Sequence, residues 1–245
     1  MNLPAPDAPL PVAVRPAYPA LEFPSPVPPA TGTVTPLADG VLWLRMPLPF
    51  ALDHINLWLL RDGAGYAIVD CGFGSDATRA AWDSIFADHA PITRVIATHY
   101  HPDHVGLAGW LTRRWDAALW MTEAEYLTAH AVWDGMAGYG GDALARLFEA
   151  HGLDAGGVTA IGSRGNAYRR SVTDLPATFR RITDGDRIAI GANEWRVIVG
   201  YGHAPEHAAL YCERLGVLIS GDMLLPKIST NTSVWSTEPD GDPVG

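Results

Sequence analysis

The stretch Thr98-His99-Tyr100-His101-Pro102-Asp103-His104 places three histidines and one aspartate within six consecutive positions. It follows the apolar run 95–97, which has the composition of a buried strand. Because side chains alternate between the two faces of an extended chain, His99 and His101 point the same way and can bind one metal ion. Asp103 and His104 come after Pro102, where the chain must turn, and they can serve a neighbouring ion. The stretch therefore predicts a metal site at the end of a strand.

Three further motifs follow other apolar runs. Asp70-Cys71-Gly72 comes after the run 66–69, and Ser220-Gly221-Asp222 comes after the run 217–219. Gly202-His203-Ala204-Pro205-Glu206-His207 lies shortly after the run 195–199. Taken together and in this order, the four motifs resemble the signature of the metallo-β-lactamase superfamily over about residues 40–226. The resemblance implies an α+β fold, an αββα sandwich in which two β-sheets lie between helices and metal ions bind at one edge.

The resemblance also implies a role for the polar residues of these motifs. A first metal ion would be bound by His99, His101 and His203. Asp103 and His104 would bind a second ion, and Asp222 would bridge both. Two more residues are expected to support these ligands. They are Asp70, whose carboxylate can orient a ligand histidine from the end of a strand, and His207, four residues after His203.

The expected ligands determine the chemistry. Imidazole nitrogens and carboxylate oxygens favour zinc, although iron and manganese also fit such a set. Two ions about 3.5–4 Å apart can share a water and lower its pKa to about 7. We expect the resulting hydroxide to attack a carbonyl group, with Asp103 orienting the hydroxide or taking its proton. The form of the motif is closest to glyoxalase II-like thioesterases and related lactonases, so the expected partner is a small-molecule acyl substrate, a thioester or a lactone.

One departure from the family pattern concerns the second ion. Family members with two metal ions draw a further histidine from the chain after the bridging aspartate, and this sequence has no histidine after His207. It ends in the loop-like stretch 238–245. We expect the sequence to be an incomplete version of a longer protein, without the C-terminal elements of the sandwich. The alternative is a weak second site.

Two other classes of function stay open. Persulfide dioxygenases share this fold and motif but use one iron held by two histidines and one aspartate, and His99, His203 and Asp222 could fill those positions. The third possibility is a metal-stabilised interaction domain without enzymatic activity.

Composition limits the domain organisation. Eleven of the 20 prolines lie in residues 1–36, which favours an extended N-terminal arm over a packed element. Residues 37–245, with 48% hydrophobic residues in the whole chain, are long enough for one metallo-β-lactamase domain. We expect its first sheet to begin with the runs 41–44, 55–60 and 66–69, and its second sheet to contain the runs 187–190, 195–199, 210–212 and 217–219.

Charge and cysteine content exclude other classes. A net charge of -10 offers no basic surface for nucleic acid, and no apolar run approaches the length of a membrane span. Without a signal-peptide pattern at the N-terminus, a cytoplasmic location is the expectation. The two cysteines, Cys71 and Cys212, both lie in apolar strand contexts and are expected to be buried thiols. The oligomeric state is not indicated.

A helical insertion is expected at about residues 123–178. Its helices are predicted at 123–131 and 143–151, and the stretch 165–170 has a loop-like composition. Such a segment can act as a lid, with Tyr139 and Tyr168 as pocket walls and Arg169 as an anchor for an acidic substrate. Core packing and surface charge explain the same residues equally well. His54, before the second strand, could approach the site from a loop or serve only as a polar loop residue.

Overall fold

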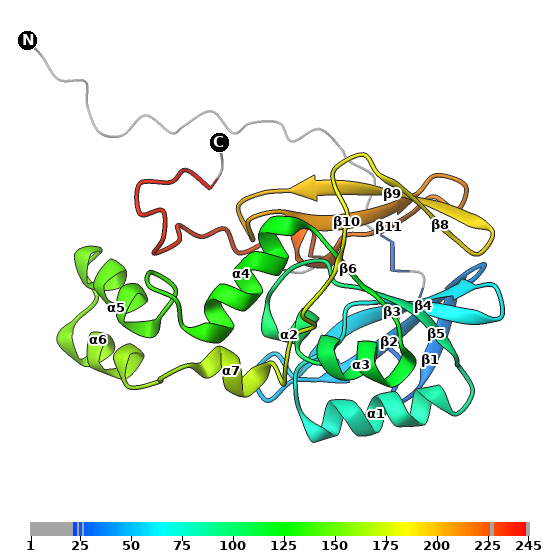
Figure 1. Ribbon diagram of the computed structural model, residues 1–245, viewed down its shortest axis with the longest axis horizontal. Coiled ribbons are helices and arrows are strands. Elements are labelled where there is room, and N and C mark those ends of the chain that lie inside the picture. Colours follow the sequence, from blue (N-terminus) through cyan, green and yellow to red (C-terminus); the bar gives the residue numbers. More distant parts are fainter. Residues whose placement is uncertain (1–21, 24, 26, 226–227, 244–245) are drawn as a thin grey trace, which may run out of the picture.

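The computed structural model describes residues 22–23, 25, 27–225 and 228–243. Two β-sheets pack face to face, and helices that include α1 (Asp76–Phe86) and α3 (Ala108–Trp115) cover the outer face of the first sheet (Figure 1). The first sheet consists of β1 (Val34–Ala38), β2 (Val41–Pro47), β3 (His54–Asp62), β4 (Gly65–Val69), β5 (Ile92–Ile96), β6 (Leu119–Met121) and β7 (Arg180–Arg181). The second sheet consists of β8 (Arg187–Ile190), β9 (Asn193–Gly200), β10 (His207–Cys212) and β11 (Val217–Ile219). This arrangement confirms the predicted α+β sandwich.

The helices form two groups in space. α1 (Asp76–Phe86), α2 (Pro102–Val105) and α3 (Ala108–Trp115) lie along the first sheet, while the second group extends to one side of the sandwich (Figure 1). The second group comprises α4 (Glu123–Asp134), α5 (Gly141–Ala150), α6 (Ala155–Gly162) and α7 (Ala167–Ser171). Within the described ranges, no helix covers the outer face of the second sheet, where Arg187, Glu194 and Arg196 are exposed (Figure 1).

Alternation of side chains along the strands builds two hydrophobic cores. On β4, Tyr66 and Ile68 face the helices and pack near Trp82 of α1. Ala67 and Val69 face the other way and pack with Trp195 and other apolar residues of the second sheet. Both faces of β4 are buried, so its apolar run is continuous rather than alternating. Burial on both faces fixes the first sheet between the helices and the second sheet.

The topology of the first sheet determines where its strands end. β1 to β4 are antiparallel, whereas β4, β5, β6 and β7 run parallel to one another. The carboxyl ends of parallel strands meet at one edge of a sheet, and in open α/β sheets this edge is where ligands bind. The motifs that begin at Asp70 and Thr98 therefore lie side by side, because they follow β4 and β5.

Local side chains determine where two of the helices begin. The side chain of Ser75 caps α1 by accepting a hydrogen bond from the backbone N–H of Thr78 at 3.2 Å, a role for which serine is a preferred residue. The loop-like composition predicted for 165–170 was wrong in part, because α7 forms there. The Asn166 side chain starts that helix by accepting from the N–H of Arg169 at 2.9 Å.

The N-terminal arm falls mostly outside the described residues, so residues 1–21 of this prediction are not placed. β1 begins at Val34, before the expected end of the arm, and includes Pro36. β1 is an edge strand with an irregular register between Pro36 and Ala38, and a proline is tolerated there because it need not donate to a neighbouring strand. The boundary between arm and domain stays a prediction. Among the described residues, no helix combines the length and apolar character that crossing a lipid bilayer requires.

Candidate metal centre

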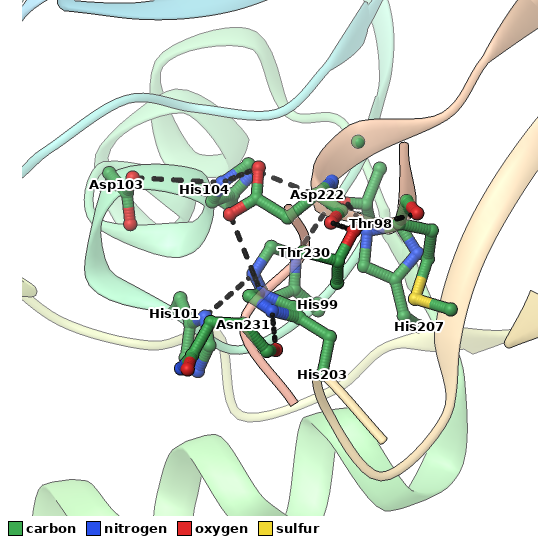
Figure 2. A network of polar contacts seen from close by, with 12 residues as sticks. Thr98, His99, His101, Asp103, His104, His203, His207, Asp222, Thr230 and Asn231 are labelled. Atoms are coloured by element: carbon green, nitrogen blue, oxygen red, sulfur yellow. Dashed lines mark hydrogen bonds and ion pairs between the residues drawn. The ribbon is translucent and has the colours of Figure 1, made fainter. Parts of the chain in front are cut away.

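Both sheets contribute strand ends to one polar cluster (Figure 2). From the first sheet come the loop after β5, with His99, His101, Asp103 and His104, and Asp70 directly after β4. From the second sheet come His203 in the loop after β9, His207 at the start of β10, and Asp222 after β11. The histidine and aspartate motifs extend from Asp70 to Asp222 in the sequence and are thus neighbours in space.

The first group contains His99, His101, His203 and Asp222. One potential ligand atom from each of these residues lies within 4.8 Å of the others. His99 Nε2 is 2.9 Å from His101 Nδ1 and 3.2 Å from His203 Nε2. His203 Nε2 is in turn 3.4 Å from Asp222 Oδ2. The structure thus brings together the three histidines predicted to bind the first ion and Asp222, the predicted bridge, and their roles as ligands stay predictions.

The second group lies on the other side of the Asp222 carboxylate. His104 Nε2 is 3.4 Å from Asp222 Oδ1 and 3.7 Å from Asp103 Oδ2 (Figure 2). Asp222 therefore presents one oxygen to His203 and the other to His104. This is the position that a carboxylate bridging two ions would need, although the bridging role itself stays a proposal.

Hydrogen bonds at the far side of the rings determine which nitrogen faces the cluster. His203 Nδ1 donates to the backbone carbonyl of Asn231 at 2.8 Å, which leaves the lone pair on Nε2. The hydroxyl of Thr98 donates to Asp70 and lies 3.0 Å from His99 Nδ1, so that His99 Nδ1 donates to Thr98. The Nε2 atoms of His99 and His203 then face each other with lone pairs, and these two lone pairs cannot form a hydrogen bond.

Burial keeps two histidines of the first group neutral. Burial and the neighbouring histidines lower the pKa of His101 to about 3, and the same causes hold the pKa of His99 well below its usual value. Burial raises the pKa of the Asp222 carboxyl group, but the neighbouring imidazoles of His104 and His203 outweigh burial and hold this pKa well below the usual range. Neutral imidazoles beside an ionised carboxylate are the protonation states that a divalent cation requires of its ligands.

The second group also fits a cation. His104 is 1% exposed, and its Nε2 atom makes no hydrogen bond although it faces two carboxylates. Burial lowers the pKa of His104, but the charges of Asp70 and Asp103, the nearby Asp222 carboxylate and the hydrogen bond with Asp70 outweigh burial and hold this pKa well above the usual value. The surroundings thus favour positive charge at this nitrogen. A metal ion would supply that charge in place of a proton.

Asp70 supports the loop after β5 through several contacts. Its carboxylate accepts from the backbone N–H of Thr98 at 2.7 Å and from His104 Nδ1 at 2.8 Å. Asp70 has a φ of 66°, a conformation in which aspartate is among the better tolerated side chains. Through these contacts Asp70 lies at the Nδ1 side of the His104 ring, away from the Nε2 atom that faces Asp222, and its predicted role as an orienting carboxylate stays a prediction.

His207 contacts the turn that carries Asp222. The backbone N–H of Asp222 donates to His207 Nε2 at 3.2 Å, and His207 is buried. Gly221 has a φ of 50°, and a side chain there would collide with the His207 ring. His207 therefore lies where it can fix the position of the Asp222 backbone.

The predicted pocket residues differ in burial and in their contacts. His54 is the first residue of β3, and its ring bonds to Asp53 at 2.6 Å. Tyr168 is buried, and its hydroxyl donates to the carbonyl of Tyr100. It therefore supports the loop after β5 instead of forming an open pocket wall. Arg169 is exposed and lies over the ring of Trp133, with 5.2 Å between its guanidinium carbon and the ring centre. Tyr139 is partly buried near the start of α5.

The chain after Asp222 also contributes to the site. Besides the carbonyl of Asn231, it supplies Trp235, whose ring centre lies 6.2 Å from that of His101 and 5.9 Å from that of Tyr100. A cavity of about 560 Å³ lies between this segment and the loop after β9, and its lining includes Ala204, Pro205 and Trp235. A second cavity of about 670 Å³ is lined by Arg187, Glu194 and Arg196, none of which belongs to the metal motifs.

Sequence reasoning missed three residues that hold the loops in place: Glu125, Asn231 and Trp235. Their contacts join segments far apart in the chain, and no local spacing pattern indicates them. Glu125 is a helix residue in a predicted insertion, where a surface position is the default for a glutamate. In the structure Glu125 is buried against the loop after β5 and the loop after β9, which we call the metal loops.

Two stacked sheets with histidines and carboxylates gathered at one edge define a metal-binding α+β sandwich. Residues 51–244 match the family description "Metallo-beta-lactamase superfamily", and the chain belongs to that superfamily. It is 26% identical over 200 residues to a probable metallo-hydrolase, YqjP, from Bacillus subtilis (strain 168), a match that covers 79% of this chain and 60% of the relative. A shorter segment of 70 residues is 40% identical to a hydroxyacylglutathione hydrolase from Rhodospirillum rubrum, covering 29% of this chain and 25% of that protein.

Solved structures agree with this assignment. A beta-lactamase domain protein from Burkholderia ambifaria superposes with a TM-score of 0.80 at 47% identity, covering 90% of this chain and 64% of that one. A metallo-beta-lactamase family protein from Thermus thermophilus gives a TM-score of 0.69 at 32% identity, covering 80% and 64%. The chain thus spans less than two thirds of the length of these relatives.

Proposed function

We propose that the protein is a metal-dependent hydrolase that cleaves an acyl bond, a thioester or a lactone, in a small molecule. The observation that carries the proposal is the pair of Nε2 lone pairs of His99 and His203, 3.2 Å apart and backed by the Asp222 carboxylate. Holding two nitrogen lone pairs beside a carboxylate in a buried place is unfavourable unless a cation binds between them. Membership of the superfamily and similarity to a probable metallo-hydrolase support hydrolysis as the reaction class.

We assign six metal ligands in two groups, with His99, His101 and His203 in the first, Asp103 and His104 in the second, and Asp222 between them. Divalent ions bound there, with zinc as our first choice, would polarise a substrate carbonyl and lower the pKa of a coordinated water. Asp103 is the candidate catalytic base, because its side chain is 24% exposed and reaches both the ligand cluster and the solvent. Asp70 and His207 support the rings and the Asp222 turn.

The substrate class is inferred from shape and from one relative. The cavity of about 560 Å³, whose lining includes Gly202 and Ala204 on either side of His203 in the chain, has the size of a small-molecule pocket. The 70-residue segment that resembles a hydroxyacylglutathione hydrolase favours a thioester. A cytoplasmic location, expected from the sequence, stays a prediction.

The first experiment is the metal content per chain, measured by plasma mass spectrometry on protein purified without added metal or chelator. We expect about two zinc ions per chain, together with hydrolysis of model thioesters or lactones that continues in the absence of oxygen. A single iron per chain with oxygen consumption would replace the hydrolase by an oxygenase that uses His99, His203 and Asp222.

Two variants test whether the site performs the reaction. His99→Ala and His203→Ala should each abolish turnover, since each removes a ligand of the first ion. His89→Ala is the control, because the described contacts of the His89 ring are with the carbonyl of Ile85 and the ring of Tyr66, neither of which belongs to the metal motifs. Unchanged turnover in both ligand variants would contradict a metalloenzyme and favour a non-enzymatic domain.

A further inference from the structure

Glu125 is a buried carboxylate that touches both metal loops. It lies in the first turn of α4 and is 0% exposed. Its Oε2 atom accepts from the backbone N–H of Tyr100 at 2.9 Å, and its Oε1 atom accepts from the backbone N–H of Glu206 at 2.6 Å. One side chain therefore ties the loop after β5 to the loop after β9.

The two backbone amides belong to the peptide segments that carry the ligands. Tyr100 lies between His99 and His101, and Glu206 lies between His203 and His207. The loop with Tyr100 follows β5 of the first sheet, and the loop with Glu206 follows β9 of the second sheet. Any change in the distance between the two loops would change the distance of 3.2 Å between His99 Nε2 and His203 Nε2.

The contact with the second loop is reciprocal. Glu206 Oε2 accepts from the backbone N–H of Ala124 at 3.2 Å, and the hydroxyl of Thr122 donates to the carbonyl of Glu206 at 2.9 Å. The start of α4 and residue 206 thus form three hydrogen bonds with each other. This number of contacts fixes the orientation of the helix relative to the loop after β9.

Tyr168 holds the other side of the first loop. Its hydroxyl donates to the carbonyl of Tyr100 at 2.6 Å, and the two rings lie 6.1 Å apart in the core. The N–H and the C=O of Tyr100 are therefore both held by buried side chains of the helical insertion. Because its N–H and its C=O are both bonded, the backbone of Tyr100, between the two ligand histidines, has little freedom to rotate.

The burial of Glu125 needs an explanation beyond packing. A buried carboxylate is unfavourable unless it receives hydrogen bonds, and an apolar residue of similar volume would usually stabilise a core better. Both of its bonds go to metal loops, and neither goes to its own helix. We infer that the two bonds serve the geometry of the site.

We propose that Glu125 and Tyr168 are positioning residues of the first metal site. They hold the Tyr100 peptide and the loop after β9, and thereby set the separation of His99, His101 and His203 before an ion binds. The helical insertion then serves as a brace for the metal loops, in addition to any role as a lid. The inference rests on the proposed metal site but not on the choice of substrate.

Cobalt binding to the metal-free full chain tests this role without measuring catalysis. Glu125→Gln replaces one acceptor oxygen by an NH₂ group that faces a backbone N–H, and Tyr168→Phe removes one donor with little change in volume. We expect the Kd for Co²⁺ to rise about tenfold or more in Glu125→Gln, and by less in Tyr168→Phe. We also expect the visible absorption of the bound cobalt to shift, because the ligand geometry changes.

Two matched controls separate positioning from general stability. Glu123→Gln removes a carboxylate from the same turn of α4, where Glu123 pairs at 3.0 Å with Arg181. Tyr126→Phe removes a hydroxyl that donates to the carbonyl of Pro176 at 3.0 Å, away from the metal loops. Both controls should bind cobalt with wild-type affinity and spectrum.

Two results would overturn the proposal. Wild-type affinity and an unshifted spectrum in folded Glu125→Gln and Tyr168→Phe would refute the positioning role and leave the metal site intact. If Glu125→Gln fails to fold, Tyr168→Phe alone decides in the same way. If the wild-type chain binds no cobalt, the metal site and the proposed function fail together.

Discussion

Glu125 carries a titratable group in surroundings that oppose its charge. Burial raises the pKa of its carboxyl group from the ordinary value of 4.5 to about 7, although hydrogen bonds from the amides of Glu206 and Tyr100 act in the opposite direction. The nearby Glu206 carboxylate raises it further, whereas His203 lowers it. Near neutral pH, the residue that ties the metal loops together is therefore close to half protonated.

This shift makes the stability of the metal-free protein depend on pH. The folded chain keeps the Glu125 proton to higher pH than the unfolded chain does. The contribution of Glu125 to the free energy of unfolding is therefore complete below about pH 4.5, and it is lost as the pH rises through about 7. The loss amounts to about 3 kcal/mol at most. Glu125→Gln cannot titrate, so its stability should fall less over the same range.

Urea denaturation of both metal-free proteins between about pH 5 and about pH 8 measures the difference. The comparison with the variant isolates Glu125, because the other titrating groups are common to both chains. Parallel curves for the two proteins would show that Glu125 is ionised throughout.

At the scale of elements, the helical insertion divides into two parts. α4 and α7 contact the metal loops through Glu125 and Tyr168. α5 and α6 pack against each other as a hairpin that stands away from the sheets, and α6 has no buried residue (Figure 1). The brace and the hairpin are therefore separable, although they are continuous in the sequence.

A deletion tests that separation. The position that a side chain would take at Gly141 lies 3.5 Å from the carbonyl of Ile161 and 3.9 Å from that of Gly165, so the two ends of the hairpin nearly meet. Joining Gly141 to Gly165 directly should leave metal content and the visible cobalt spectrum unchanged. The intact chain, prepared in parallel, is the control. A loss of bound metal would show that the hairpin also braces the loops, and a rise in KM alone would indicate a lid.

At the scale of the whole molecule, the metal centre joins the two sheets. His99 and His101 follow a strand of the first sheet, whereas His203 and Asp222 follow strands of the second. An ion bound by both sets holds only in the folded state, in which the sheets are stacked. Its binding free energy is therefore added to the stability of the sandwich.

Chelation should measure this coupling. With zinc at about 100 times its Kd, the expected stabilisation is about 2.7 kcal/mol, or several degrees in Tm for a chain of this size. Adding EDTA should lower Tm by this amount, and adding zinc in excess should restore it. The double variant His99→Ala/His203→Ala is the control, because its Tm should not respond to EDTA. An equal response in both proteins would mean that the ion binds elsewhere.

Local pattern was enough to predict part of this structure. The motif around His99 and His101 requires an extended chain followed by a turn, and the apolar run before it forms β5 as expected. The hairpin of β3 and β4 and the four strands of the second sheet follow from alternating or continuous apolar runs bounded by turn residues. The composition of residues 165–170 was misleading, because a short helix started by Asn166 needs only one side-chain contact that composition does not reveal.

The sequence by itself determined most strands of the two sheets, the residue types of the candidate metal centre and the strand ends that carry them, because each depends on neighbours within a few positions. Tertiary structure alone decided that Glu125 and Tyr168 hold the Tyr100 peptide and that the Asn231 carbonyl selects the His203 tautomer. These hydrogen bonds join residues 25 to 68 positions apart and exist only after two sheets and a helix have packed. No local periodicity encodes them, since the direction of a buried side chain is set by what packs around it.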